Sequence, residues 1–115
     1  MPFTDIELAG HKRTLNAWLE KERPPPHIRP KLDFGYRITN QSVELFEVRP
    51  AFHRPKEKQE EPLAKATWNK RQGVWQVYWQ RADLKWHRYE PTRSVATLNA
   101  FLKLVREDKH ACFFG

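Results

Sequence analysis

The strongest constraint on the fold is an aromatic stretch between residues 68 and 90. It holds four of the five tryptophans and two of the three tyrosines of the chain. Successive side chains of a β-strand point to opposite faces, so a strand over residues 74–81 places Trp75, Val77 and Trp79 on one face. The large apolar area on that face predicts that it is buried, and that the rest of the chain is arranged to cover it.

A second aromatic strand, residues 84–90, follows the first after a short polar connection. If Ala82-Asp83 is a two-residue turn, Trp79 and Trp86 lie together on the buried side, which faces the helices. That dipeptide is not typical of a tight primed turn, so a longer loop, which would regroup the second strand, stays open. The two-residue turn predicts these cross-strand pairs: Trp79 with Trp86, Val77 with Arg88, Tyr78 with His87, and Gln76 with Tyr89.

Three further strands are indicated by the same alternation of apolar and polar side chains. Residues 32–38 and 42–49 flank the polar turn 39–41, and residues 64–69 precede the polar loop 70–73, which ends in glycine. Polar connections of this length are typical of antiparallel hairpins. We therefore expect five antiparallel strands.

A helix is predicted on each side of these strands. Thr4 and Glu7 form a capping-box pattern at the start of the first helix, which is expected to continue to Glu22. Ser94 is the expected N-cap of the second helix. Apolar residues spaced by three and four predict that one stripe of the second helix packs on the sheet; they are Val95, Leu98, Phe101, Leu102 and Val105.

Two connectors are rich in proline. The three consecutive prolines Pro24–Pro26 end the first helix and favour an extended polyproline segment, expected to act as a rigid connector. Residues 50–62 hold three prolines and a charge run that is nearly balanced in sign. We expect a surface loop there, at the end of the sheet, and such loops also carry function.

These elements define an α+β fold in a single domain over residues 1–115. Helix, two strands, loop, three strands and helix predict a five-stranded antiparallel meander, with the N-terminal and C-terminal helices packed on one face. A chain of 115 residues can bury a sufficient core without disulfides or metals. Its last aromatic residues, Phe113 and Phe114, would each forgo roughly 1.5–3 kcal/mol if left in water. At least one of the two rings is therefore expected to dock on the core, near the second helix.

The sequence also indicates a compartment. The lone Cys112 excludes an internal disulfide framework. No apolar run approaches the roughly 18 residues that a membrane-spanning helix needs. Residues 1–4 lack the basic-then-apolar pattern of a secretory signal. We expect a soluble cytoplasmic protein with no membrane contact, and its oligomeric state stays open.

The charge of the chain indicates the chemistry of its partner. The net charge is +7. Residues 62–93 alone carry seven cations against two acids, so this segment has a charge of 7 − 2 = +5. Such a balance favours an acidic partner, single-stranded nucleic acid first and an acidic protein second. A basic surface that serves only solubility is the alternative.

Residues suited to catalysis or metal binding are sparse. The histidines are far apart and no pair has the spacing of zinc ligands; they are His11, His27, His53, His87 and His110. His11 is expected at the edge of the core, and Cys112, beside Phe113, as a buried and inert thiol. With only four glycines there is no glycine-rich phosphate loop. The sequence therefore favours a non-catalytic protein without a metal or a cofactor.

One enzymatic alternative stays open. Asp33, Glu47 and Arg49, with Glu20 or Glu22 on the preceding helix, are similar to the residues with which metal-dependent nucleases hold Mg²⁺. Those enzymes normally have a lysine where Arg49 stands, and arginine does not readily lose a proton to act as a base. The pattern is short, so it is kept as a remote alternative.

The binding hypothesis depends on the second face of the aromatic strands. Exposed aromatic rings between cations suit single-stranded nucleic acid, because rings stack on bases and cations meet phosphates. The candidate nucleic-acid-binding residues are Lys65, Tyr78, Lys85, His87 and Tyr89. A protein–protein interaction module is the alternative, and it would use this face, the Pro24–Pro26 arm or the 50–62 loop.

Four runs carry a resemblance to a known family. They are Arg-Pro-Pro-Pro-His-Ile-Arg-Pro (residues 23–30), Ser-Val-Glu-Leu-Phe-Glu-Val-Arg-Pro (42–50), the tryptophan-rich run 73–91 and the terminal Ala-Cys-Phe-Phe-Gly (111–115). The chain resembles a family of small bacterial proteins catalogued only as a domain of unknown function. The resemblance covers nearly the whole chain and implies a bacterial stand-alone domain. It implies no activity, cofactor or catalytic residue.

Overall fold

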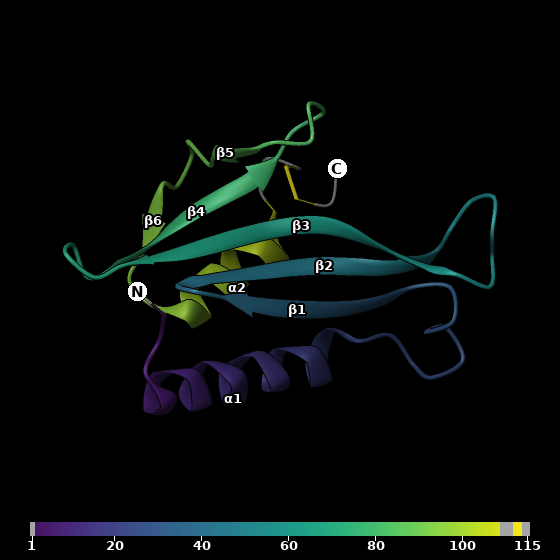
Figure 1. The fold of residues 1–115 in the computed structure, drawn as a ribbon, viewed down its shortest axis with the longest axis horizontal. Helices are drawn as coiled ribbons and strands as arrows, with labels where there is room; N and C mark the ends of the chain where they lie inside the picture. Colours follow the sequence, from purple (N-terminus) through teal and green to yellow (C-terminus); the bar gives the residue numbers. More distant parts are fainter. Residues whose placement is uncertain (1, 109–111, 114–115) are drawn as a thin grey trace.

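An antiparallel sheet forms one layer of the molecule and two helices form the other, in the computed structural model (Figure 1). The structure describes residues 2–108 and 112–113. This arrangement confirms the predicted α+β fold. In chain order the elements are α1 (Asp5–Glu22), β1 (Asp33–Thr39), β2 (Ser42–Pro50), β3 (Lys58–Asn69), β4 (Val74–Gln80), β5 (Trp86–Arg88), β6 (Ser94–Val95) and α2 (Leu98–Glu107).

The strands follow one another in the order β1-β2-β3-β4-β5, which confirms the predicted antiparallel meander. The short strand β6 is an addition, and it pairs with β4 through Trp75 and Val95. The prediction that Ser94 caps the second helix is therefore wrong, because Ser94 pairs with Gln76 in the sheet. Thr97 is the N-cap instead, and its hydroxyl accepts the backbone N–H of Ala100 at 3.0 Å.

The tight connections of the meander form where residues tolerate the left-handed region of backbone space. Asn40, between β1 and β2, has φ 54°, and Gly73, just before β4, has φ 67°. Glycine and asparagine adopt this conformation at the lowest cost among the amino acids. The side chain of Asn69 also accepts the N–H of Gln72 at 3.1 Å, which closes the loop between β3 and β4.

The hairpin of β2 and β3 is longer than expected. Residues 50–62 are not one surface loop, because β2 continues to Pro50 and β3 begins at Lys58. The hairpin extends beyond the helices at the right of Figure 1. Charged side chains hold part of this extension, such as Arg37 with Glu60, whose side-chain nitrogen and oxygen lie 2.6 Å apart.

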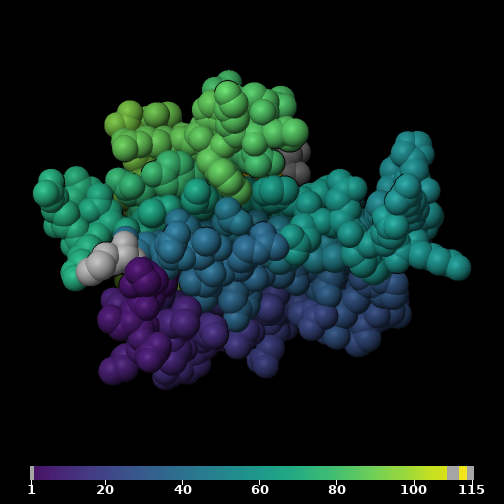
Figure 2. Space-filling model, in the orientation of Figure 1, coloured from purple at the N-terminus to yellow at the C-terminus, as the bar shows by residue number. Residues whose placement is uncertain are grey.

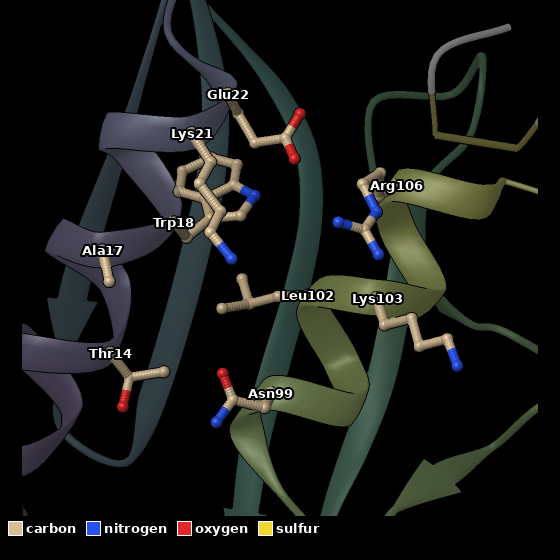
Figure 3. A pocket seen from close by; sticks show the side chains of 9 residues that line it. All are labelled: Thr14, Ala17, Trp18, Lys21, Glu22, Asn99, Leu102, Lys103 and Arg106. Carbon is tan, nitrogen blue, oxygen red and sulfur yellow. The ribbon is translucent and has the colours of Figure 1, made fainter.

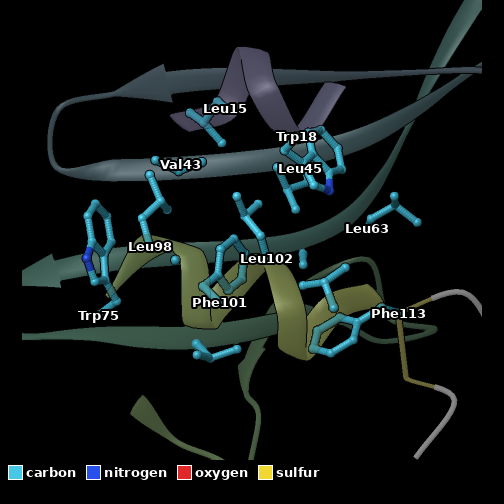
Figure 4. Packing of buried hydrophobic residues seen from close by; sticks show 14 of the residues in the cluster. Leu15, Trp18, Val43, Leu45, Leu63, Trp75, Leu98, Phe101, Leu102 and Phe113 are labelled. Atoms are coloured by element: carbon cyan, nitrogen blue, oxygen red, sulfur yellow. The ribbon is translucent and has the colours of Figure 1, made fainter. Parts of the chain in front are cut away.

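Both helices cover the same face of the sheet, here called the inner face; the opposite face, which no helix covers, is the outer face. Alternation in the strands sends Val43, Leu45 and Val77 to the inner face, where all three are fully buried. They form one core with side chains of α1 and α2 (Figure 4). Four of the five predicted stripe residues are buried on α2, namely Leu98, Phe101, Leu102 and Val105, and the fifth, Val95, lies in β6.

The C-terminal phenylalanine ring and His11 both pack against the core, as predicted. Phe113 is buried, and its ring centroid lies 4.8 Å from that of Tyr89, which confirms that a terminal ring docks on the core. Phe114 lies outside the described residues. His11 packs on Trp75 at 5.1 Å between ring centroids, at the edge of the core as expected.

The connector between α1 and β1 differs from the prediction. Residues 26–31 form turns, so the extended polyproline segment does not continue beyond Pro25. The N–H of Ile28 donates to the carbonyl oxygen of Pro25 at 2.9 Å, and Arg29 Nε donates to the carbonyl oxygen of Pro24 at the same distance. Because proline lacks only the N–H, its carbonyl can still accept these bonds, and they close the segment into a compact turn.

Candidate nucleic-acid interface

The loop between β4 and β5 decides which side chains share a face. It spans residues 81–85, and its ends are joined by the N–H of Arg81, which donates to the carbonyl oxygen of Lys85 at 3.2 Å. Leu84 lies in it with φ 62°. The two-residue turn is therefore wrong, and the register moves by one residue. The pairs are Tyr78 with Arg88, Trp79 with His87, and Gln80 with Trp86.

This shift overturns the predicted tryptophan ladder. Trp79 belongs to the inner face, where it is partly buried against the core. Trp86 lies opposite Gln80 and belongs to the outer face, where it is also only partly buried. The prediction that both indoles are largely buried on the helix side is wrong. The missing tight-turn dipeptide at Ala82-Asp83 was the only sequence signal for this regrouping.

The shift also separates the five predicted site residues. Lys65 and Tyr78 are direct cross-strand neighbours on the outer face. Lys85 is exposed in the loop. His87 lies opposite Trp79, on the inner side. Tyr89 is only 1% exposed, because the chain leaves β5 at Arg88 and turns this ring onto Phe113.

A cluster that the sequence did not predict as a unit replaces them. We call it the outer aromatic patch, and it consists of Lys65, Tyr78, Trp86 and Arg88. The Nζ atom of Lys65 lies 5.7 Å from the ring centroid of Tyr78 and 5.7 Å from that of Trp86. These distances are within the range of cation–π attraction, so one cation joins two rings from neighbouring strands.

The outer aromatic patch is part of a row that crosses the whole sheet. Each member faces the next across a strand pair, from Arg37 on β1 to Arg88 on β5. In order, the row is Arg37, Glu44, Lys65, Tyr78 and Arg88. Figure 2 shows this outer face, built by the side chains of the strands, with α2 hidden behind it. Within the described residues, no helix covers this face.

The two halves of this row differ in charge. On β1 and β2, Arg37 is paired with Glu44 at 3.6 Å and with Glu60 at 2.6 Å. On β3 and β5, neither Lys65 nor Arg88 has an ion-pair partner among residues 2–108 and 112–113. The positive field of the outer face is therefore concentrated at the outer aromatic patch.

In the β1–β2 half of the outer face, the side chains pack closely on one another, in addition to forming ion pairs. The ring of Phe46 lies against the backbone of Gly35, so closely that a Cβ at position 35 would come within 2.6 Å of a ring carbon. Arg37 lies over the same ring, with its Cζ atom 5.2 Å from the centroid. Glycine is needed here to let the aromatic ring approach the strand.

The loop beside the patch is held by Asp83. Its carboxylate accepts the N–H of Lys85 at 2.9 Å and lies 2.8 Å from Nε2 of His87. The bond from the Lys85 backbone, followed by the bond from His87, lowers the pKa of Asp83. The carboxylate therefore stays charged at neutral pH and fixes the loop next to Trp86.

The residues of the nuclease alternative do not come together. Asp33 lies opposite Val48 on the outer side and is bound by Arg23, with Nε–Oδ1 and Nη2–Oδ2 distances of 2.9 and 2.6 Å. This bidentate bond is the main cause of the lowered pKa of Asp33. Glu47 is buried on the inner side and is bound by Arg49 at 2.6 Å. Among the described residues no three metal-ligating side chains are grouped.

Comparison with known proteins gives a family and no activity. No curated protein and no solved structure matches the chain. Within residues 2–108 and 112–113, no helix has the length and apolar character that crossing a bilayer requires. A family model described as "Domain of unknown function (DUF3024)" matches residues 3–115, which include every helix and strand described above. The chain therefore belongs to this family of domains of unknown function.

Proposed function

We propose that this domain is a non-catalytic module of the bacterial cytoplasm that binds single-stranded nucleic acid on the outer aromatic patch. The observation that carries the proposal is the position of Lys65, with its Nζ 5.7 Å from the rings of both Tyr78 and Trp86. Single-stranded nucleic acid needs this combination, because its bases stack on aromatic rings while its phosphates approach cations.

The spacing of the patch suits successive nucleotides. Tyr78 and Trp86 stand on the adjacent strands β4 and β5, which lie about 4.8 Å apart in a sheet. Rings on adjacent strands can each receive one unstacked base. The amides of Gln76 and Gln80 flank the rings on β4, and the Tyr78 hydroxyl donates to Oε1 of Gln76 at 3.2 Å. Amides that can rotate offer both donors and acceptors to base edges, which favours little sequence preference.

The charge of the patch predicts weak binding that depends on salt. Lys65 and Arg88 have no ion-pair partner within the described residues, and Lys85 is exposed in the adjacent loop. Two or three phosphate contacts give a shallow salt dependence, since each contact contributes about 0.7 to the slope for a single strand. We therefore expect measurable but weak affinity in low salt and a gradual loss as the salt concentration rises.

The first test is fluorescence anisotropy of a labelled single-stranded oligonucleotide at two salt concentrations. Tyr78→Ala and Trp86→Ala should each cost roughly 1–3 kcal/mol of binding free energy and leave the salt slope unchanged. Lys65→Gln should lower the affinity and reduce the slope by about 0.7. These separate effects distinguish base stacking from phosphate contact.

Matched controls come from other regions of the chain. Phe52→Ala removes an aromatic ring that is 90% exposed at the tip of the β2–β3 hairpin, and Lys12→Gln removes an exposed cation of α1. Phe52→Ala should leave the affinity for the oligonucleotide unchanged. Lys12→Gln should lower it only by the small effect of one lost positive charge far from the patch. If no complex forms at micromolar protein in low salt, or if Trp86→Ala and Phe52→Ala behave alike, the proposal fails. A protein–protein interaction module then becomes the better description of the outer face.

A further inference from the structure

A groove runs between α1 and α2 in the helical layer, on the other side of the sheet from the outer aromatic patch. One part of it is a cavity of about 190 Å³ between Trp18 of α1 and Leu102 of α2 (Figure 3). A smaller cavity of about 80 Å³ continues beneath Trp18 toward Phe34. A shallow hollow extends the groove in the other direction toward Gly10. From Gly10 to Glu22 this is about 18 Å along α1, at 1.5 Å per residue.

The groove exists because the two helices do not interlock along their length. α1 presents Thr14 and Ala17 to this space, and α2 presents Asn99, so the side chains are too short to fill it. The floor is apolar where Trp18 and Leu102 meet. The remaining apolar surface there suits one or two bulky apolar side chains from outside.

Positive charges line this groove. Arg13 and Lys21 of α1 border it on one side, Lys103 and Arg106 of α2 on the other, and Glu22 is the one acid among its lining residues. In the part of the chain that the structure describes, none of these four cations forms an ion pair. Figure 3 shows Lys21 and Arg106 reaching into the space between the helices from opposite sides. Cations spread along a partly apolar groove are best neutralised by carboxylates from a partner.

We infer that this helical groove is a docking site for an acidic segment of a partner protein, in which a bulky apolar side chain stands among carboxylates. The apolar side chain enters the cavity between Trp18 and Leu102, and the carboxylates face Lys21 and Arg106. The length of the groove and the spread of its cations match a peptide segment. Such a segment would be several residues long if extended, or several turns long if helical.

Two other occupants fit less well. A small anion would meet cations that are distributed along the groove rather than gathered at one point. A nucleic acid would need a free aromatic face, but the Trp18 indole is only 9% exposed and packs on Phe34, with ring centroids 6.3 Å apart. Base stacking is therefore not available in the groove, in contrast to the outer aromatic patch.

The test uses the full-length chain, immobilised, and a displayed library of random peptides of about twelve residues, enough to span the groove as a helix. A parallel selection uses Ala17→Trp, which fills the groove from an exposed position. Peptides enriched on the native chain and not on the filled variant should contain several Asp or Glu residues and at least one of Leu, Ile, Phe or Trp.

One enriched peptide is then synthesised with a fluorescent label and measured against matched variants. Lys21→Glu and Arg106→Glu should each weaken binding about tenfold or more, because each replaces attraction by repulsion. Lys12→Glu and Ala9→Trp make the same changes at exposed positions of α1 outside the groove and should leave affinity within about twofold. Thermal unfolding of each variant shows whether it is folded, and Lys21→Glu and Arg106→Glu provide two independent tests.

The outcomes separate this site from the outer aromatic patch. Peptide binding should survive Trp86→Ala, and oligonucleotide binding should survive Ala17→Trp. The inference is overturned if no peptide is enriched above the filled variant, if the enriched peptides lack acidic residues, or if Lys21→Glu and Lys12→Glu have equal effects. Loss of oligonucleotide binding in Ala17→Trp would also overturn it, since the groove would then belong to the nucleic-acid site.

Discussion

The two helices lie on the same face of the sheet but are held there in different ways. α2 has ten residues, four of them buried: Leu98, Phe101, Leu102 and Val105. α1 has eighteen residues, of which only Leu15 and Trp18 are buried. The shorter helix therefore contributes more to the core than the longer one. α1 is anchored along one line of contacts, and the rest of its surface is available for binding.

This difference explains where the groove lies. A helix that buries a full stripe of side chains fills the space beneath it, as α2 does with Leu98, Phe101, Leu102 and Val105. A helix that has small or polar side chains toward its neighbour leaves space there. Incomplete packing of this kind costs stability, and binding sites are common where that cost is tolerated.

The largest contrast is expected between the buried rings of the two helices. Phe101→Ala should lower the free energy of unfolding by about 3–5 kcal/mol, because a fully buried ring leaves a cavity that cannot collapse. Trp18→Ala should cost less, about 2–3 kcal/mol, since the indole already borders the groove and water can enter its place. Urea unfolding of both variants measures the difference. Equal losses would show that α1 is as much a part of the core as α2.

The second contrast concerns the two N-caps. Thr97→Ala should destabilise the whole domain by about 1 kcal/mol, because the first turn of α2 is packed into the core. Thr4→Ala removes a reciprocal capping box, in which Thr4 Oγ1 accepts the Glu7 N–H at 3.2 Å and Glu7 Oε1 accepts the Thr4 N–H at 2.9 Å. The first turn of α1 is exposed, and Ile6 within it has 87% of its surface in solvent. The destabilisation caused by Thr4→Ala should therefore remain local to that turn.

Hydrogen exchange together with global unfolding separates these two cases. For Thr4→Ala we expect faster exchange in residues 6–9 and a global loss below about 0.5 kcal/mol. For Thr97→Ala we expect the loss of about 1 kcal/mol in the free energy of global unfolding and also in the stability measured by hydrogen exchange. A global loss for Thr4→Ala as large as that for Thr97→Ala would contradict the picture of a locally attached α1.

The smallest effect is a pH dependence that comes from α1. Burial against Phe3 and Trp75 lowers the pKa of His11, and the charge of Glu7 only partly opposes this. The folded state therefore prefers the neutral ring. Its contribution to stability is complete above the ordinary pKa of about 6.5 and is lost as the pH falls below that value, because the unfolded chain binds the proton more tightly.

The measurement compares the native chain with His11→Gln. Thermal unfolding at about pH 7.5 and about pH 5.5 should show a smaller drop in stability for the variant. All other residues are the same in the two proteins, so their contributions cancel in the difference. An identical drop in the two proteins would mean that the ring of His11 is not held neutral by the core.

The sequence was sufficient for the order of the elements and for most of the meander. Alternating side chains predicted β1, β2 and β4, and capping residues predicted the start of α1 at Thr4. Where one face is buried and the other is wet, the alternation leaves a single consistent register. The same rule explains the main error, because one additional residue in the loop 81–85 reverses both faces of β5 and moves Trp86 outward.

Two features could not be found from local patterns. The β2–β3 extension has no apolar alternation because both of its faces are solvated, and long-range pairs such as Arg37 with Glu60 support it. The helical groove is formed by residues of α1 and α2 that are about 80 positions apart, and the α1 residues alone look like an ordinary exposed helix face. A single sequence shows neither pairing, because both depend on tertiary contacts.

The position of α1 in the chain also affects how the domain is made. The ribosome produces α1 before any strand, but the rings of Phe3 and His11 pack on Trp75 of β4, and Trp18 completes its packing only with α2. A nascent chain therefore carries Leu15 and Trp18 uncovered while the sheet is being synthesised. During that interval chaperones have access to this helix. The first helix to be translated is consequently among the last elements to reach its native contacts.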